Sequence, residues 1–168
     1  MATYIQIGST VTVGAGGAAS IDFTSIPGTY TDLVIKISAR SEGTSTNAIL
    51  LRLNGSTAAG SIRAIEGNGA TASSWTDTKS YAGNIPPSSY TASTFANNEV
   101  YIPNYAGSNN KSSSVDSVTE NNATTALADL QANLWSNTAA VTSITLAPNG
   151  TNNFAQYTTA TLYGISKS

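Results

Sequence analysis

The sequence predicts a single all-β domain, an antiparallel β-sandwich of about eight to ten short strands. Apolar and polar residues alternate with a period of two along many segments, and clusters of Gly, Pro, Asn and Ser separate these segments. The length of 168 residues is sufficient for one domain with a hydrophobic core and short for two. We therefore treat residues 1–168 as one domain.

The clearest alternation covers residues 32–40. Successive side chains of a strand point to opposite faces, so half of this segment is expected in the core. The residues expected on the core face are Leu33, Ile35, Ile37 and Ala39. Lys36 and Arg40 fall on the other face, which indicates a half-buried strand.

Other segments repeat this pattern with different strength. The stronger ones predict strands at residues 49–53, 99–102, 141–146 and 160–165. The weaker ones predict strands at residues 4–7, 10–13, 18–23, 61–65 and 112–119. Strands of this length and spacing favour a sandwich or a barrel.

Residues 123–135 fit two structures. Leu127, Leu130 and Leu134 have the spacing of one face of an amphipathic helix of about three turns. Leu130, Ala132 and Leu134 also lie on one face of a strand. The strand is favoured because threonines precede it and the following third of the chain is rich in strand patterns.

Residues 67–98 show little periodicity and predict an irregular excursion from the sandwich. Long irregular segments are usually functional or disordered, and disordered segments contain few aromatic residues. This segment contains Trp75, Tyr81 and Tyr90. We therefore expect it to be ordered and to pack on the domain or on a neighbouring molecule.

The residues needed for most enzyme chemistry are missing. The chain contains no His and no Cys, so Ser–His–Asp and Cys–His arrangements are excluded. Asp116 and Glu120 are the nearest acids on one face of an expected strand, about 13 Å apart by strand rise, which is too far for a glycosidase pair. We expect no enzyme, no catalytic residues, no cofactor and no metal site.

Charge and hydropathy exclude two further classes of partner. Only 10% of the residues are charged, the net charge is −2 and the isoelectric point is about 4.8, whereas nucleic-acid-binding domains are basic. No apolar stretch approaches the 18 or so residues of a membrane span. We expect neither nucleic acid nor membrane as a partner, and a surface of hydroxyls and amides.

The aromatic residues give the best positive signal for binding. The eight tyrosines outnumber the three Phe and two Trp together, and tyrosine suits interfaces because it combines apolar area with a polar tip. The candidate partner-binding residues are Tyr4, Ile5, Trp75, Tyr81 and Tyr90.

Several motifs, in order along the chain, resemble a group of small structural proteins of tailed bacteriophages. The motifs are Phe-Thr-Ser-Ile-Pro-Gly-Thr-Tyr-Thr-Asp-Leu at 23–33, Tyr-Ile-Pro-Asn-Tyr at 101–105, Leu-Trp-Ser at 134–136, Ile-Thr-Leu at 144–146, Asn-Phe-Ala-Gln at 153–156 and Leu-Tyr-Gly-Ile at 162–165. The resemblance implies a jelly-roll-like sandwich located in the virion, on the capsid or in a tail appendage.

Of these two places the capsid is favoured, because the chain is a short single domain without a fibre-forming repeat and has a low-charge, hydroxyl-rich surface. The expected function is capsid decoration: a cement protein that binds and stabilises the assembled shell. Its partners would be further copies of itself, as a homotrimer, and the major capsid protein or other virion proteins. It would be localised in the virion, assembled in the host cytoplasm. The alternative is a receptor-binding module of the tail that recognises host surface glycans by aromatic stacking, for example with Trp75 and Tyr81.

Overall fold

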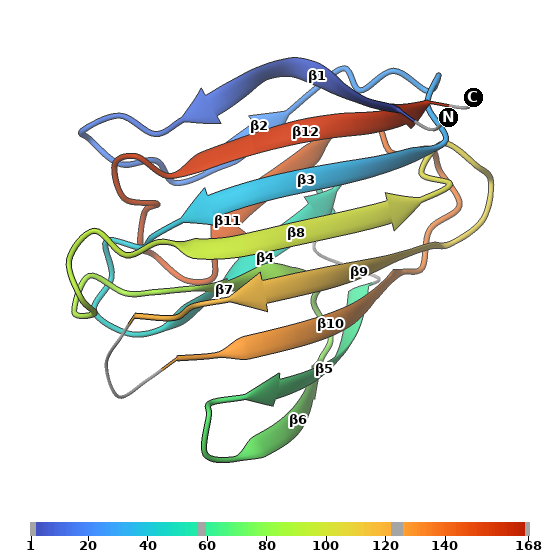
Figure 1. Cartoon of the computed structure of the whole chain (residues 1–168). Coiled ribbons are helices and arrows are strands. Elements are labelled where there is room, and N and C mark those ends of the chain that lie inside the picture. Colours follow the sequence, from blue (N-terminus) through green and yellow to red (C-terminus); the bar gives the residue numbers. More distant parts are fainter. Residues whose placement is uncertain (1–2, 57–59, 122–125, 167–168) are drawn as a thin grey trace.

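The structure, a computed structural model, describes residues 3–56, 60–121 and 126–166. These residues form strands, turns and loops without a helix, and the strands make two antiparallel sheets that pack as a sandwich (Figure 1). The predicted all-β sandwich is confirmed. The described residues contain twelve strands, more than expected.

The first sheet has eight strands and the second has four. The first runs in the order β1 (Thr3–Thr12), β12 (Thr159–Ser166), β3 (Asp32–Ala39), β8 (Ala96–Pro103), β9 (Lys111–Val118), β10 (Ala128–Trp135), β5 (Gly60–Gly67) and β6 (Ala72–Asp77). The second runs in the order β2 (Ile21–Phe23), β11 (Ile144–Pro148), β4 (Asn47–Leu53) and β7 (Tyr81–Ile85).

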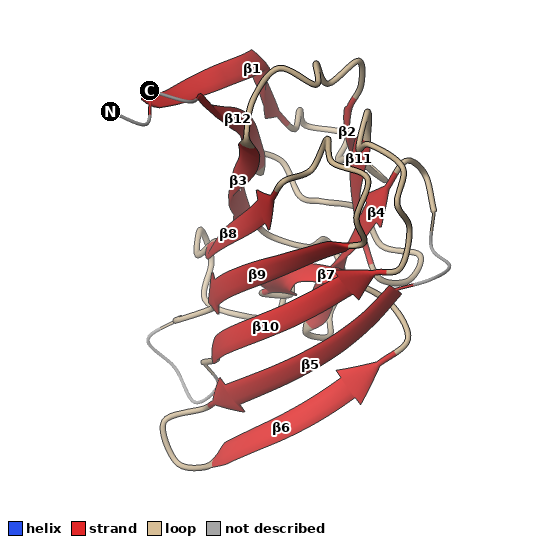
Figure 2. Ribbon diagram, turned by 90° about the vertical axis from the view of Figure 1, so that its right-hand side faces the viewer, coloured by secondary structure: helices blue, strands red, loops and turns tan. Residues whose placement is uncertain are grey.

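Eight of the strands follow a regular order when the hairpins β5–β6 and β9–β10 are set aside. Numbered along the chain from one to eight, they form one sheet in the order 1-8-3-6 and the other in the order 2-7-4-5. The two hairpins are insertions that continue the first sheet beyond β8. Figure 2 shows β5 and β6 extending past the second sheet. We call β9, β10, β5 and β6 the sheet extension.

The core lies between the sheets, and the predicted core face of β3 is confirmed, although Val34 and Arg40 on the other face are buried as well. Leu33, Ile35, Ile37 and Ala39 are all at most 2% exposed and belong to the main hydrophobic cluster. They face strands of the second sheet, whose inward residues are also predominantly aliphatic. This burial of apolar area is the main favourable contribution to folding.

Three expectations need correction or completion. The patterns at 4–7 and 10–13 belong to one strand, β1, with a bulge near Gly8. The strand favoured for 123–135 is confirmed as β10, while residues 122–125 lie outside the described part of the chain. The expected irregular excursion at 67–98 contains β6 and β7, so that expectation is wrong for these two segments. These two strands contain Gly, Ser and Asn, so their sequences lack the alternation of apolar and polar residues that is typical of strands.

The loop from 86 to 95 is irregular but ordered by Arg40. The guanidinium of Arg40 donates to the carbonyl oxygens of Ser88, Tyr90, Thr91 and Thr94 at 2.8 to 3.1 Å. Burial lowers the pKa of Arg40, because the charged form loses hydration. The four carbonyl dipoles replace that hydration, and they fix the loop against the end of β3.

The core assignment gives a first prediction. Leu33→Ala should lower the free energy of unfolding by about 2–5 kcal/mol, because it removes a fully buried side chain and leaves a cavity. Ser38→Ala, an exposed position on the same strand, is the control and should change it by less than about 0.5 kcal/mol. Urea unfolding of both variants measures the difference, and equal stabilities would contradict the assigned faces of β3.

Candidate functional site

The five predicted partner-binding residues do not form one site. Tyr4 and Ile5 lie on β1, at one edge of the eight-stranded sheet, and are 54% and 41% exposed. Trp75 lies on β6, at the opposite edge of that sheet. Tyr90 lies in the 86–95 loop, half-buried, with its hydroxyl 2.9 Å from Thr46 Oγ1. A partner that met all of them would have to surround the molecule.

Tyr81 is not available to a partner in the way expected. Its side chain is only 3% exposed, and the ring of Trp75 meets it edge to face with the centroids 5.9 Å apart. The Tyr81 hydroxyl donates to Asp77 Oδ2 at 2.7 Å. Burial, and then this hydrogen bond, raise the pKa of Tyr81 to about 12, while the same bond lowers the pKa of Asp77. The buried ring of Tyr81 therefore packs against Trp75 inside the protein. Of these two rings, Trp75 is the one on which a sugar could stack.

A buried polar cluster holds the open edge of β7 against the sheet extension. Asn133 Oδ1 accepts from the backbone N–H of Tyr81 at 3.1 Å, and its Nδ2 donates to the Tyr81 carbonyl at 2.9 Å. Ser117 Oγ accepts from the Asn84 N–H at 2.9 Å, and Asn98 Nδ2 donates to the Asn84 carbonyl at 3.2 Å. These side chains replace the strand that β7 lacks on this side, which meets the hydrogen-bonding demand of a buried edge.

Gly83 allows this close approach. It lies in the middle of β7 with φ +94°, a conformation that favours glycine. A Cβ atom at this position would lie 2.5 Å from Asn98 Oδ1 and 2.9 Å from Ser117 Cβ. Any side chain at position 83 would therefore push β7 away from β8 and β9.

Two carboxylates that are far apart in sequence lie opposite each other in this region. Asp129 of β10 and Glu66 of β5 are cross-strand partners. Glu66 accepts from Ser73 Oγ at 3.1 Å and from Trp75 Nε1 at 3.1 Å. A search for neighbouring acids in the sequence could not find this pair, because only the strand order brings them together.

Asp129 is 5% exposed, and its two oxygens have different surroundings. Oδ2 accepts from Asn84 Nδ2 at 2.8 Å and from Gln131 Nε2 at 2.6 Å. Oδ1 has no hydrogen-bond partner among the described atoms, and neither has Gln131 Oε1. Burial raises the pKa of Asp129 to about 6, with a further rise from Glu66. A proton on Oδ1 would provide a donor beside these buried acceptors, so the neutral acid suits this place.

Both carboxylates of this pair are engaged in contacts within the fold. Asp129 is covered by β7 and its neighbours, and Glu66 is occupied by two donors. A general acid must reach the proton acceptor of its substrate within hydrogen-bond distance. In the described part of the chain no three His, Cys, Asp or Glu residues are grouped in a way that could hold a metal ion.

On β10 the usual placement of side chains is reversed, with polar residues inside and apolar residues outside, and a local alternating pattern cannot distinguish this from the usual placement. On β10 the polar residues Asp129, Gln131 and Asn133 point inward and are at most 5% exposed. The apolar residues of the extension that point outward are exposed: Ile65 61%, Leu130 55%, Val118 40% and Leu134 38%. We call the surface formed by the outward side chains of β9, β10, β5 and β6 the outer face. It is the main candidate interaction surface.

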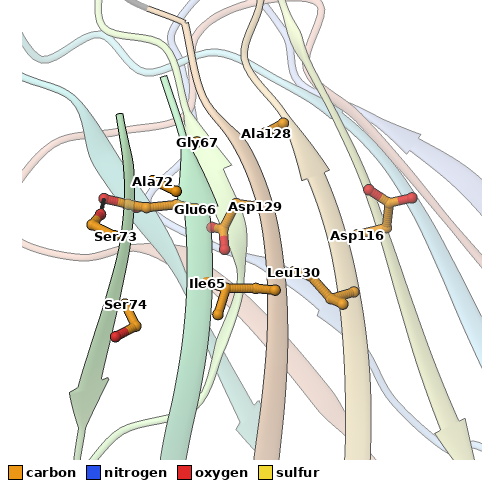
Figure 3. Close-up of a pocket in the computed structure, with 10 residues that line it drawn as sticks. All are labelled: Ile65, Glu66, Gly67, Ala72, Ser73, Ser74, Asp116, Ala128, Asp129 and Leu130. Atoms are coloured by element: carbon orange, nitrogen blue, oxygen red, sulfur yellow. Dashed lines mark hydrogen bonds between the residues drawn. The ribbon is translucent and has the colours of Figure 1, made fainter. Parts of the chain in front are cut away.

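Two hollows lie on the outer face, separated by Ile65 and Leu130. One has a volume of about 640 Å³ and is floored by the small residues Gly67, Ala72 and Ala128 (Figure 3). The other, of about 470 Å³, is lined in part by Arg63, Thr76 and Ala132. These hollows are shallow and open to solvent, and they indicate a contact surface and not an enclosed ligand site.

Comparison with family models, with curated proteins and with solved structures found no match to the chain. Among the described residues there is no helix long and apolar enough to cross a membrane. The function therefore has to be inferred from the strand order and the surfaces of this chain.

The pKa of Asp129 gives a second prediction. Because it is higher in the folded than in the unfolded chain, its contribution to stability is complete below about pH 4 and is lost as pH rises through about 6. Between pH 4 and pH 8 this should cost about 2–3 kcal/mol. Asp129→Asn keeps an uncharged donor at this position and should flatten that pH profile.

Urea unfolding of both proteins at a series of pH values measures this effect. Glu66→Gln serves as the control, because it removes a neighbouring carboxylate and leaves Asp129 to titrate. Identical pH profiles for the native chain and Asp129→Asn would contradict the assignment.

Proposed function

We propose that this chain is a structural protein of a bacteriophage virion, a jelly-roll capsid decoration protein that binds and stabilises the assembled shell. The observation that carries the proposal is the strand order 1-8-3-6 and 2-7-4-5 of the eight strands outside the inserted hairpins. This order agrees with two interleaved Greek keys, the jelly roll, a topology that recurs in viral capsid proteins and in lectins, and it therefore supports the proposal. The motif resemblance to phage structural proteins points in the same direction.

The surface composition supports contact with other proteins. Charged residues make up 10% of the chain. Among the described residues one ion pair is found, between Lys36 and Glu99. Hydroxyl and amide groups therefore provide most of the polar surface. Such groups suit broad, hydrated interfaces in which hydrogen bonds and shape determine the fit.

Stabilisation of a shell needs no chemical step. A protein that binds the assembled lattice and not its separated subunits shifts the equilibrium towards the lattice by mass action. The absence of His and Cys from the sequence fits a role of this kind. The protein would act by binding alone.

The edge strand β1 is the surface that we assign to the shell. Tyr4 and Ile5 are exposed on it, and the ring of Tyr4 is held edge to face on Tyr163 at 6.1 Å between centroids. A preorganised aromatic side chain loses little conformational entropy on binding. β1 also lies at the opposite edge of the sheet from β6, away from the sheet extension.

The number of copies per particle tests the proposed function. Mass spectrometry of purified virions should find hundreds of copies, in a fixed ratio to the major capsid protein. A few tens of copies or fewer, together with glycan binding by the isolated chain that Trp75→Ala abolishes, would replace decoration by the tail receptor-binding function.

The shell contact gives a third prediction. Tyr4→Ser with Ile5→Ser should weaken co-sedimentation with particles that lack the protein by about tenfold or more, because it removes two exposed apolar side chains from the contact. Tyr157→Asn is the matched control: Tyr157 is 67% exposed, lies beside Val13 at the far end of β1 from Tyr4 and Ile5, and has φ 70°, which Asn tolerates. Equal loss of binding in both variants would contradict the assignment of β1.

A further inference from the structure

The outer face has no intramolecular reason to be apolar. Leu130 and Leu134 of β10 alternate with inward residues that bond to β7 or to each other, and no described segment covers them. Exposed apolar patches of a few hundred Å² are often functional contact sites, and here the aliphatic side chains are surrounded by small and hydroxyl residues. One hollow lies on each side of Ile65 and Leu130, and Figure 3 shows the one lined by Gly67, Ala72 and Ala128. Side chains of a partner could enter both hollows.

Two opposite charges flank the centre of the outer face. Arg63 on β5 and Asp116 on β9 are the only charged residues that point outward from residues 60–67, 72–77, 111–118 and 128–135. Neither forms an ion pair with another described residue. Glu99, the neighbour of Asp116 on β8, is already paired with Lys36. On the outer face, Asp116 thus has no cation as an ion-pair partner and Arg63 has no acid as one among the described residues.

The register makes this pair of charges self-complementary. Asp116 lies beside Leu130 of β10, and Arg63 lies beside Ala132, on the other side of the same strand. The midpoint between Arg63 and Asp116 therefore falls on β10 at Gln131. A two-fold axis in the plane of the interface, passing through this point, exchanges the two positions. Two-fold interfaces require a patch that is complementary to itself in this way.

We infer that the outer face binds a second copy of this chain, face to face about this two-fold axis, with Arg63 of each copy paired to Asp116 of the other. Each copy then covers the apolar centre formed by Ile65 and Leu130 of the other copy. The two ion pairs lie at its border, where they set the relative orientation of the copies.

The area of the outer face is sufficient for such a pair. Four strands of six to eight residues, with strands about 4.8 Å apart and residues about 3.3 Å apart, cover roughly 500 Å². Two such faces bury roughly 1,000 Å² in total, which is where specific interfaces begin. The pairing goes beyond the proposed function and uses a different surface from β1. It favours a two-fold assembly over the homotrimer expected from the sequence.

A charge exchange tests the pairing by sedimentation equilibrium of the purified full chain. The native chain should be a dimer. Arg63→Asp or Asp116→Arg should each raise the dissociation constant of the dimer by about tenfold or more, because like charges then meet across the interface. The double variant Arg63→Asp/Asp116→Arg should return to within about threefold of the native value. Both substituted positions are exposed, and unchanged circular dichroism and melting temperature of the three variants would show that the fold is intact.

Lys79→Asp is the matched control, because Lys79 is an exposed cation in the β6–β7 connection outside the outer face. It should leave the dimer unchanged. A native chain that is monomeric at about 100 µM, a trimer, or a dimer that neither single charge reversal weakens would overturn the inference. A monomer that still binds particles would overturn the pairing alone, whereas a dimer with no place in the virion would overturn the proposed function alone.

Discussion

The open edge of β7 is the constraint from which most features of this structure follow. The second sheet ends at β7, and the long sheet passes over that edge. Backbone groups buried there need partners, and no further strand can supply them. Asn133, Ser117 and Asn98 provide these partners from the inner side of β10, β9 and β8. Glycine at position 83 keeps the distance short enough for these bonds.

This arrangement determines the polarity of the sheet extension. Because alternate residues of a strand face opposite sides, amides on the inner side leave the aliphatic residues of β10 on the outer side. The cluster is also not fully satisfied, since Asn98 Oδ1, Asp129 Oδ1 and Gln131 Oε1 have no partner among the described atoms. A buried polar group without a partner costs free energy, and a proton on Asp129 reduces that cost. The raised pKa of Asp129 and the exposed outer face therefore have the same origin.

Local patterns in the sequence were sufficient for the strands whose inner side is apolar. The alternation around Leu33 and Ile37 located both β3 and its buried face. In the eight strands outside the inserted hairpins, most apolar residues face the core and most polar residues face away from it. The expectation that apolar residues point inward is wrong for β10, because the open edge of β7, and not an apolar layer, faces this part of the sheet. Nothing local distinguishes Leu130 from a core leucine, and β7, with Gly83 and Asn84 at its centre, lacks a strand pattern. The pairing of Glu66 with Asp129 depends on strand order, which short-range spacing does not encode.

The two inserted hairpins have different effects on their two sides. On the inner side, Asn133 and Ser117 hold β7, so the hairpins contribute to the stability of the second sheet. On the outer side, Leu130 and Ile65 are cross-strand neighbours that remain 55% and 61% exposed, so much of their apolar area stays in contact with water. From this exposed apolar area we infer that the outer face contacts another molecule. The outer face also carries one cation and one anion on opposite sides of β10, and neither forms an ion pair with a described residue, so the partner that we infer for it is the same surface on a second copy.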